Sequence, residues 1–207
     1  MNPLQLLGRA DSINVRKVLW TLDELGLPYA REDWGAGFRS CQEPAFLALN
    51  PNAMVPVLRD GDFTLWESNS ICRYLAARYG AGHLLPSEPQ ARAQMEQWMD
   101  WQAGDLNTAW RVAFMALVRG QTQRAEAVAA SVALWNQRMQ VLDAQLARSG
   151  AHVLGPEFTL ADVVLGLACV RWQRAPIAHA ELPAVAAYLE RLRERPAFMR
   201  HGDNGMP

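Results

Sequence analysis

The 207-residue sequence lacks a strong excess of charge of either sign, which limits the classes of partner. Twenty lysine and arginine residues are balanced by 21 aspartate and glutamate residues, and the formal net charge is −1. Acids and bases are interspersed, without the basic stripe that binds nucleic acid or a long acidic tail. We therefore expect no nucleic-acid partner and no electrostatic attachment to a membrane.

Long apolar segments are also missing. The most hydrophobic run, LADVVLGLACV at 160–170, is far shorter than the roughly 20 residues that a membrane-spanning helix needs. Its pattern is instead typical of a helix buried on all sides. The LQLL segment near the N-terminus is too short for the core of a signal peptide. The sequence therefore predicts a cytoplasmic protein without a membrane span.

Cysteine and histidine are few, and neither has the spacing of a metal site. The three cysteines are far apart and include no CxxC pair. This spacing argues against a disulfide framework, a dithiol redox centre and a zinc site. The four histidines show no ligand spacing either, so we predict no metal. These seven residues are Cys41, Cys72, Cys169, His83, His152, His179 and His201.

The pattern of the sequence changes near residue 80. Half of the residues are hydrophobic, which is enough for a sizeable core. Up to Gly80, short β-like runs alternate with helical periodicity, and the runs on either side of Gly61 are typical of a hairpin. The expected strands are 4–8, 28–33, 55–60 and 63–67, and the expected helices are 15–25, 44–49 and 68–80. Residues 1–80 are therefore predicted to form a mixed α/β domain with the order βαβαββα.

Residues 81–89, AGHLLPSEP, have the glycine and proline content of a linker. Ser87 and Gln90 have the spacing of a capping box, and only helical patterns follow them. Thr159 and Asp162 predict a second capped helix start, and Pro183 predicts the start of the last main helix. Residues 90–207 are therefore predicted to form an all-helical domain.

Four motifs, in this order, resemble the glutathione transferase superfamily. They are a hydroxyl at the first strand-to-helix turn (Ser12), a Val55-Pro56 pair before a strand, a Glu67-Ser68 pair at a helix start, and the TLAD capping box at 159–162. The resemblance covers nearly the whole chain. It implies a thioredoxin-like first domain and glutathione as co-substrate.

The resemblance also implies how glutathione is held. Val55, before a cis Pro56, would offer its backbone to the cysteinyl part, as the edge of a sheet binds a peptide. Ser68 and Glu67 would hold the γ-glutamyl end at a helix N-terminus, and Arg39 would reach the glycine end. Without the resemblance, a trans proline on an edge strand and a helix-capping serine explain the same residues.

Two residues match known activators of the glutathione thiol. Ser12 followed by Arg16 resembles the serine-type theta class, whereas Ser12 with Asn14 resembles the TPNxxK pattern of bacterial nu-like members. No tyrosine precedes Tyr29 and no cysteine precedes Cys41, so the tyrosine and cysteine mechanisms lack their residue. Ser12 acting only as a helix cap is the alternative interpretation.

The neighbouring cations Arg9, Arg16 and Lys17 allow two interpretations. They would raise the local positive potential, or they would form a solvated helix face. For the electrophile, the resemblance points to the first helix of the second domain, where we expect Trp110, Arg111 and Phe114 to line a pocket. An aromatic stripe of this kind also fits a helix core.

The resemblance further implies a homodimer, in which Asp100 or Asp105 of a partner reaches the site. The predicted function is transfer of the glutathione thiol to a small electrophile, whose identity the sequence does not specify. Two alternatives remain at this point. One is a glutathione-dependent disulfide or peroxide reductase of nu-like type, and the other is a non-catalytic binding protein of the same fold.

Overall fold

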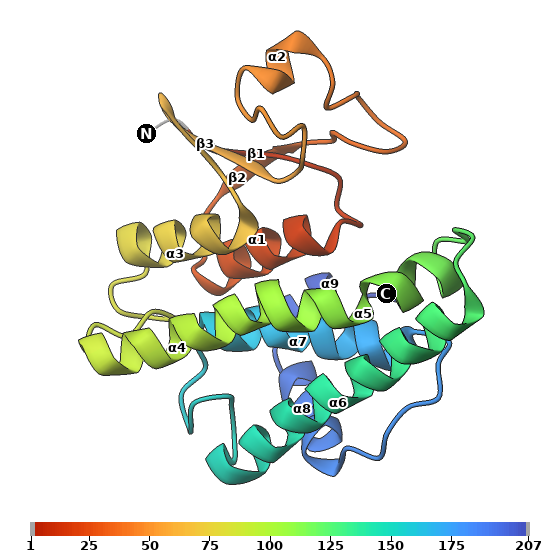
Figure 1. Cartoon of the computed structure of the whole chain (residues 1–207). Coiled ribbons are helices and arrows are strands. Elements are labelled where there is room, and N and C mark those ends of the chain that lie inside the picture. Colours follow the sequence, from red (N-terminus) through yellow and green to blue (C-terminus); the bar gives the residue numbers. More distant parts are fainter. Residues whose placement is uncertain (1–2, 206–207) are drawn as a thin grey trace.

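A computed structural model describes residues 3–205 and begins with a four-stranded mixed sheet in the order β2-β1-β3-β4 (Figure 1). Strand β1 pairs in parallel with β2 and antiparallel with β3, and β3 pairs antiparallel with β4. The expected strands and hairpin are therefore confirmed. The strands are β1 (Leu4–Leu7), β2 (Tyr29–Glu32), β3 (Val57–Asp60) and β4 (Phe63–Trp66).

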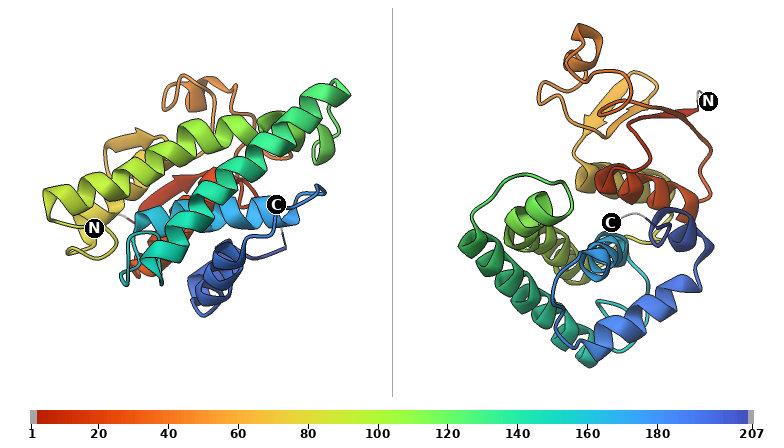
Figure 2. Two further views of the ribbon diagram at one scale, coloured as in Figure 1. Left: turned by 60° about the horizontal axis from the view of Figure 1, so that its bottom comes forward. Right: turned by 90° about the vertical axis from the view of Figure 1, so that its right-hand side faces the viewer.

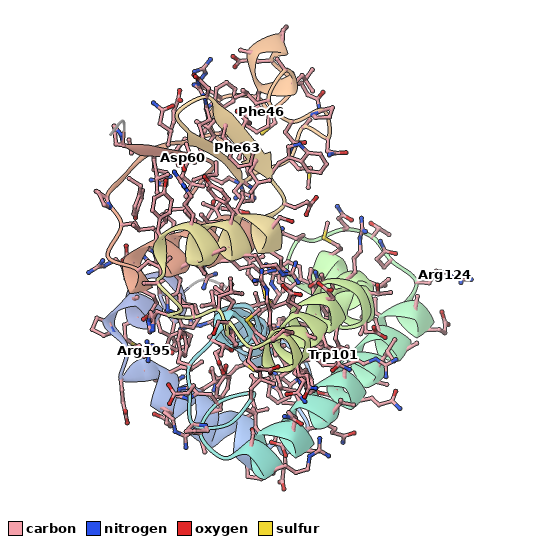
Figure 3. All side chains as sticks on the ribbon, turned by 90° about the vertical axis from the view of Figure 1, so that its left-hand side faces the viewer. Phe46, Asp60, Phe63, Trp101, Arg124 and Arg195 are labelled. Carbon is pink, nitrogen blue, oxygen red and sulfur yellow. The ribbon has the colours of Figure 1, made fainter. Side chains whose placement is uncertain are left out.

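The two faces of the sheet are covered by different helices. Helices α1 (Ile13–Glu24) and α3 (Ser68–Tyr79) cover one face, and the short α2 (Pro44–Leu47) lies on the other side (Figure 1). Side chains alternate between the faces along a strand. Leu6 and Leu58 accordingly join the main core, whereas Leu7 and Val57 join a small cluster with Phe46 of α2, labelled in Figure 3.

The second half is helical. Its elements are α4 (Pro89–Trp101), the π-helical turn η1 (Gln102–Leu106), α5 (Asn107–Leu117), α6 (Ala125–Ser149), α7 (Leu160–Arg174), α8 (Pro183–Arg193) and α9 (Pro196–His201). Helix α7 lies at the centre, surrounded by α4, α6 and α8 (Figure 2). Residues 160–172 are all buried, so the predicted buried helix is confirmed. The predicted α/β domain followed by helices is the observed fold class.

The two predicted capping boxes differ in outcome. At α7, the Asp162 carboxylate accepts the Thr159 backbone N–H at 2.8 Å and the Thr159 hydroxyl at 3.0 Å, which confirms the box. At α4, the prediction of Ser87 as cap is wrong. Glu88 is the N-cap there, because its longer side chain accepts the backbone N–H groups of Gln90 and Ala91 at 3.0 and 2.7 Å.

Residues 80–88 contain no helix or strand, although the buried hydrophobic side chains before and after them form one cluster. Helix α1 packs against α3 from its own half and against α7 and α9 from the other. Arg195, labelled in Figure 3, donates to both carboxylate oxygens of Glu24 on α1. Because the halves share this core, the division at 81–89 into two domains stays a prediction. None of the helices within residues 3–205 has the length and apolar character needed to cross a membrane.

Candidate active site

The turn from β1 into α1 brings three parts of the chain close together. Gly8 has a φ of 150°, and a Cβ added there would lie 2.6 Å from Val15 Cγ2 and 3.1 Å from Val55 Cβ. Because those distances are too short for a side chain, a glycine at this position permits the close approach. The start of α1 and the segment before β3 therefore meet at one point.

Ser12 occupies the N-cap position of α1, but its side chain does not cap the helix. Its backbone is extended (φ −75°, ψ 123°), and its hydroxyl makes no capping hydrogen bond. The backbone carbonyl of Ser12 still accepts the Arg16 N–H at 2.9 Å. The helix thus uses the main chain of Ser12 and leaves its hydroxyl available to a ligand.

A cavity of about 450 Å³ opens beside this hydroxyl. Ser12 and Asn14 line it from α1, Val55 lines it from the segment before β3, and Phe38 and Cys41 line it from the loop before α2. Sequence reasoning did not single out Cys41 for this place. Partial burial raises the pKa of its thiol, so it is protonated at neutral pH.

The Val55-Pro56 peptide bond is cis. The isomer that the family resemblance implied is therefore confirmed. Val55 is partly buried and borders the cavity, whereas Pro56 is buried beneath it at the start of β3.

The N-terminus of α3 meets the first turn of α1. Glu67 is the N-cap of α3 and has a φ of 71°, a conformation that costs a non-glycine residue of order 1 kcal/mol and that is frequent at functional sites. Its neighbour Ser68 is 6% exposed and donates its hydroxyl to Asn14 Oδ1 at 3.4 Å. Two residues predicted to bind different ends of glutathione are therefore in contact.

Two cations of α1 lie behind the cavity. Arg16 is 1% exposed and donates to the backbone carbonyls of His201, at 2.6 Å, and Gly202. Lys17 is 2% exposed and donates to Gln102 Oε1 at 3.0 Å and Asn69 Oδ1 at 3.3 Å. The interpretation of these two residues as a solvated helix face is therefore wrong.

Lys17 is charged at neutral pH, and the start of α1 is itself positive. Burial lowers the pKa of Lys17 to about 8, which leaves most of the amine protonated at pH 7. The free N–H groups at the start of α1 add positive potential at the same end. The start of α1 therefore favours an anion at the Ser12 hydroxyl.

Arg39 lies on the exposed surface next to the cavity rather than among the side chains that line it. Its guanidinium stacks over the Trp34 ring at 3.9 Å and donates to Glu32 and Glu43 at 2.8 and 2.9 Å. Those hydrogen bonds raise the pKa of Arg39. Its contact with the glycine end of glutathione stays a prediction.

The residues expected to bind the electrophile lie on α5. The rings of Trp110 and Phe114 are 5.2 Å apart in an edge-to-face arrangement, and Phe114 is buried. Arg111 faces solvent. None of the three borders the cavity at Ser12, so their role stays a prediction.

A cation that sequence reasoning missed, Arg171, contacts the rings of both Trp110 and Phe114. The Arg171 guanidinium carbon of α7 lies 4.6 Å from the Trp110 ring centre and 4.5 Å from that of Phe114. No local pattern marks Arg171, because it follows eleven consecutive buried residues of a helix. The acids expected to reach a partner subunit, Asp100 and Asp105, are exposed, and Asp100 accepts from Arg73 at 2.6 Å.

Comparison with known proteins supplies the family. Residues 11–78 match the model of the glutathione S-transferase N-terminal domain, and residues 106–196 match that of the C-terminal domain. Glutathione S-transferase GstB of Escherichia coli is 39% identical over 201 residues, which cover 95% of this chain and 96% of that one. Glutathione S-transferase 3 of Zea mays is 35% identical over 97% of this chain and 93% of its own.

A solved structure is similar throughout. The theta class glutathione S-transferase of Xanthomonas axonopodis pv. citri, crystallised with glutathione bound, has a TM-score of 0.91 at 38% identity and covers 98% of both chains. These matches favour a transferase over the reductase and the non-catalytic protein that the sequence left open. With its fold, its cis Val55-Pro56 bond and these relatives, the chain belongs to the glutathione transferase family.

Proposed function

We propose that the chain binds glutathione in the cavity at the start of α1 and transfers its thiol to a small electrophile, with Ser12 as the residue that activates the sulfur. The observation that carries this proposal is the Ser12 hydroxyl, which makes no capping bond and faces a cavity also lined by Val55. This arrangement corresponds to a serine-type, theta-like enzyme.

Asn14 has a different role in this proposal. Its Oδ1 accepts the Ser68 hydroxyl at 3.4 Å, so the side chain joins the first turns of α1 and α3. Asn14 therefore positions Ser68 for the γ-glutamyl carboxylate, together with Glu67, and Val55 holds the cysteinyl part through its backbone. Arg39 meets the glycine end from the rim.

The chemistry follows from the acidity of the thiol. A free cysteine thiol has a pKa of about 8.5, and helix N-termini and positive neighbours lower it. The Ser12 hydroxyl donates to the resulting thiolate, and the buried cations Arg16 and Lys17 stabilise its charge. The thiolate then attacks an electrophilic carbon, a C–S bond forms, and the leaving group departs with its electron pair.

The second substrate is proposed to bind against α5, where Trp110, Arg111 and Phe114 lie. The chain is further proposed to act as a cytoplasmic homodimer in the removal of electrophiles. Exposed apolar side chains support a subunit contact: Phe63 and Trp66 on the edge strand β4 are 47% and 37% exposed, and Val141 on α6 is 43% exposed. Light scattering that gives the mass of one chain would contradict the dimer.

Ultraviolet absorbance of bound glutathione tests the activating residue. The thiolate absorbs near the far-ultraviolet edge, so a pH titration gives the pKa of the bound thiol in wild type, Ser12→Ala and Asn14→Ala. A rise in that pKa in Ser12→Ala alone supports the proposal. A rise only in Asn14→Ala transfers the role to Asn14, and unchanged values in both variants would exclude both residues.

The stability of the variants serves as a control. Loss of a serine cap typically costs about 1 kcal/mol, but the Ser12 hydroxyl makes no such bond. Ser12→Ala is therefore expected to unfold at nearly the same denaturant concentration as wild type, and an effect on the thiol is then not a consequence of unfolding.

A further inference from the structure

Arg171 is a buried cation without a polar partner. The residue is 6% exposed, and its Nε is sealed from solvent without a hydrogen bond. Throughout the described part of the chain, no hydrogen bond or ion pair to its guanidinium is found, and its contacts are with the faces of Trp110 and Phe114. An aromatic face stabilises a cation, although much less than an anion with hydrogen bonds does.

The charges around Arg171 are of the same sign. Burial lowers the pKa of Arg171 to about 9, and repulsion by Arg16 and Arg119 contributes to this shift. Lys17 also lies within range of its charge. Arg16 and Lys17 of α1 and Arg171 of α7 are thus three buried cations on two helices that pack against each other.

The buried acid of this half of the molecule is too far away to balance Arg171. Arg16, by contrast, has Asp203 and Asp11 within range of its charge, and Lys17 has Glu67. Among residues 3–205, Asp162 is the fully buried carboxylate, and it accepts the capping hydrogen bonds at the other end of α7. Arg171 lies nine positions further along the helix, about 14 Å along the axis. Burying a cation without an anion is costly, so Arg171 is suited to receive a negative group.

We propose that Arg171 binds the anionic group of the second substrate, and that the electrophiles of this enzyme carry a carboxylate or a similar oxyanion. The inference rests on the proposed function, because it concerns the electrophile partner of that reaction. Trp110 and Phe114 then contact the carbon skeleton of the substrate, while the cation that they hold fixes its charged end.

A pair of benzylic chlorides represents this substrate class. In 4-(chloromethyl)benzoate, the glutathione thiolate attacks the chloromethyl carbon, a C–S bond forms, and chloride leaves with the electrons of the C–Cl bond. The thiol proton is released to solvent, and the carboxylate is unchanged. The neutral 4-(chloromethyl)benzamide has nearly the same shape and undergoes the same reaction, so the two compounds differ in charge.

Binding of unreactive analogues tests the inference without turnover. Calorimetry would measure the affinity of 4-methylbenzoate and 4-methylbenzamide for the glutathione-saturated protein. A hydrogen bond to a charged group is expected to make the benzoate bind about ten- to a hundredfold more tightly in wild type. Arg171→Met should abolish this preference, and Arg171→Lys should retain part of it, because lysine keeps the charge but loses the planar fork.

Arg138→Met is the matched control. Arg138 lies on α6, and its buried Nε also has no partner among residues 3–205. Its substitution should leave the preference for benzoate intact. Arg171→Met should melt at or above the temperature of wild type, because the variant removes an unpaired buried charge. If Arg171→Met changes the ligand preference without lowering the melting temperature, Arg171 acts on the ligand and not only on the structure.

The outcomes separate the two proposals. Equal affinity of wild type for benzoate and benzamide, or an unchanged preference in Arg171→Met, would overturn the anion site. Turnover of the benzamide chloride reports on the transferase alone. If neither chloride reacts while benzoate binding depends on Arg171, the transferase proposal fails and the anion site stands.

Discussion

Replacement of Lys17 by methionine should change how the stability of the protein depends on pH. The ammonium group of Lys17 is buried between α1, α3 and η1, where it donates to Asn69 and Gln102. Burial lowers its pKa from the ordinary 10.5 to about 8. Methionine has a similar length and no charge, so the variant removes this titration while filling most of the same space.

The sign follows from the protons bound in each state. Between pH 8 and 10.5 the unfolded chain keeps the proton of Lys17 while the folded chain loses it, so the stability of the wild type rises with pH. Below pH 8 Lys17 is protonated in both states, and the full free-energy cost of burying its charge is present. The difference between the two pKa values corresponds to about 3 kcal/mol in all, of which about 2.5 kcal/mol is recovered between pH 7 and pH 10.

Urea unfolding, followed by tryptophan fluorescence, would give the free energy of unfolding of both proteins at pH 7 and pH 10. Other groups that titrate in this range are common to both proteins and cancel in the difference. The neighbouring thiol of Cys72 does not interfere, because burial raises its pKa to about 11. Parallel pH profiles of wild type and Lys17→Met would refute the conclusion that the folded protein holds Lys17 as a buried cation.

Three further substitutions, one of them with a matched control, test the packing of the helical half. Gly166→Ala should lower the free energy of unfolding by about 1–3 kcal/mol, because the added Cβ would lie 2.7 Å from Leu192 Cδ1 and overpack the centre of α7. Gly104→Ala is the control and should be neutral or stabilising, because a Cβ there has no neighbour within 4 Å. Equal melting temperatures of the two variants would contradict this expectation. Asp162→Asn should lower the free energy of unfolding by about 2–4 kcal/mol in urea, because a buried carboxylate that accepts several hydrogen bonds becomes partly a donor. Ser131→Ala should cost about 1–3 kcal/mol in the same assay, since it removes the two hydrogen bonds that the buried hydroxyl makes with the Ala113 N–H and the Ala109 carbonyl of α5. A variant as stable as wild type would show that these two hydrogen bonds add nothing to stability.

Local sequence was sufficient for the strands and helices of this protein. Leu6 and Leu58 alternate with polar or oppositely facing residues along their strands, and the buried run of α7 has no polar face. These patterns depend on residues that are near one another in the chain. The cap of α4 shows the limit, because Ser87 and Glu88 are both reasonable caps, and the geometry of the turn decides for Glu88.

The candidate site was predicted in part. The motif residues Ser12, Val55 and Pro56 come together, and the cis bond agrees with the family resemblance. Arg39 and the residues of α5 were placed by analogy alone. The structure puts Arg39 in surface ion pairs, a partnership between side chains whose rotamers the sequence does not specify.

The sequence by itself determined the order of elements, the change from α/β to helical pattern and the residues from which a glutathione site can be built. Only the tertiary structure decided which polar groups of those residues are free to meet a ligand and which are bonded or buried inside the protein. Packing of α1 against α3 joins Asn14 to Ser68, 54 positions away. The Ser12 hydroxyl makes no capping bond, although its position at the helix start favours one. Packing of the same helix against α7 and α9 buries Arg16 and Lys17 beside Arg171. The physical reason is that burial, and with it the cost of a charge, depends on neighbours that are distant in the chain and close in space.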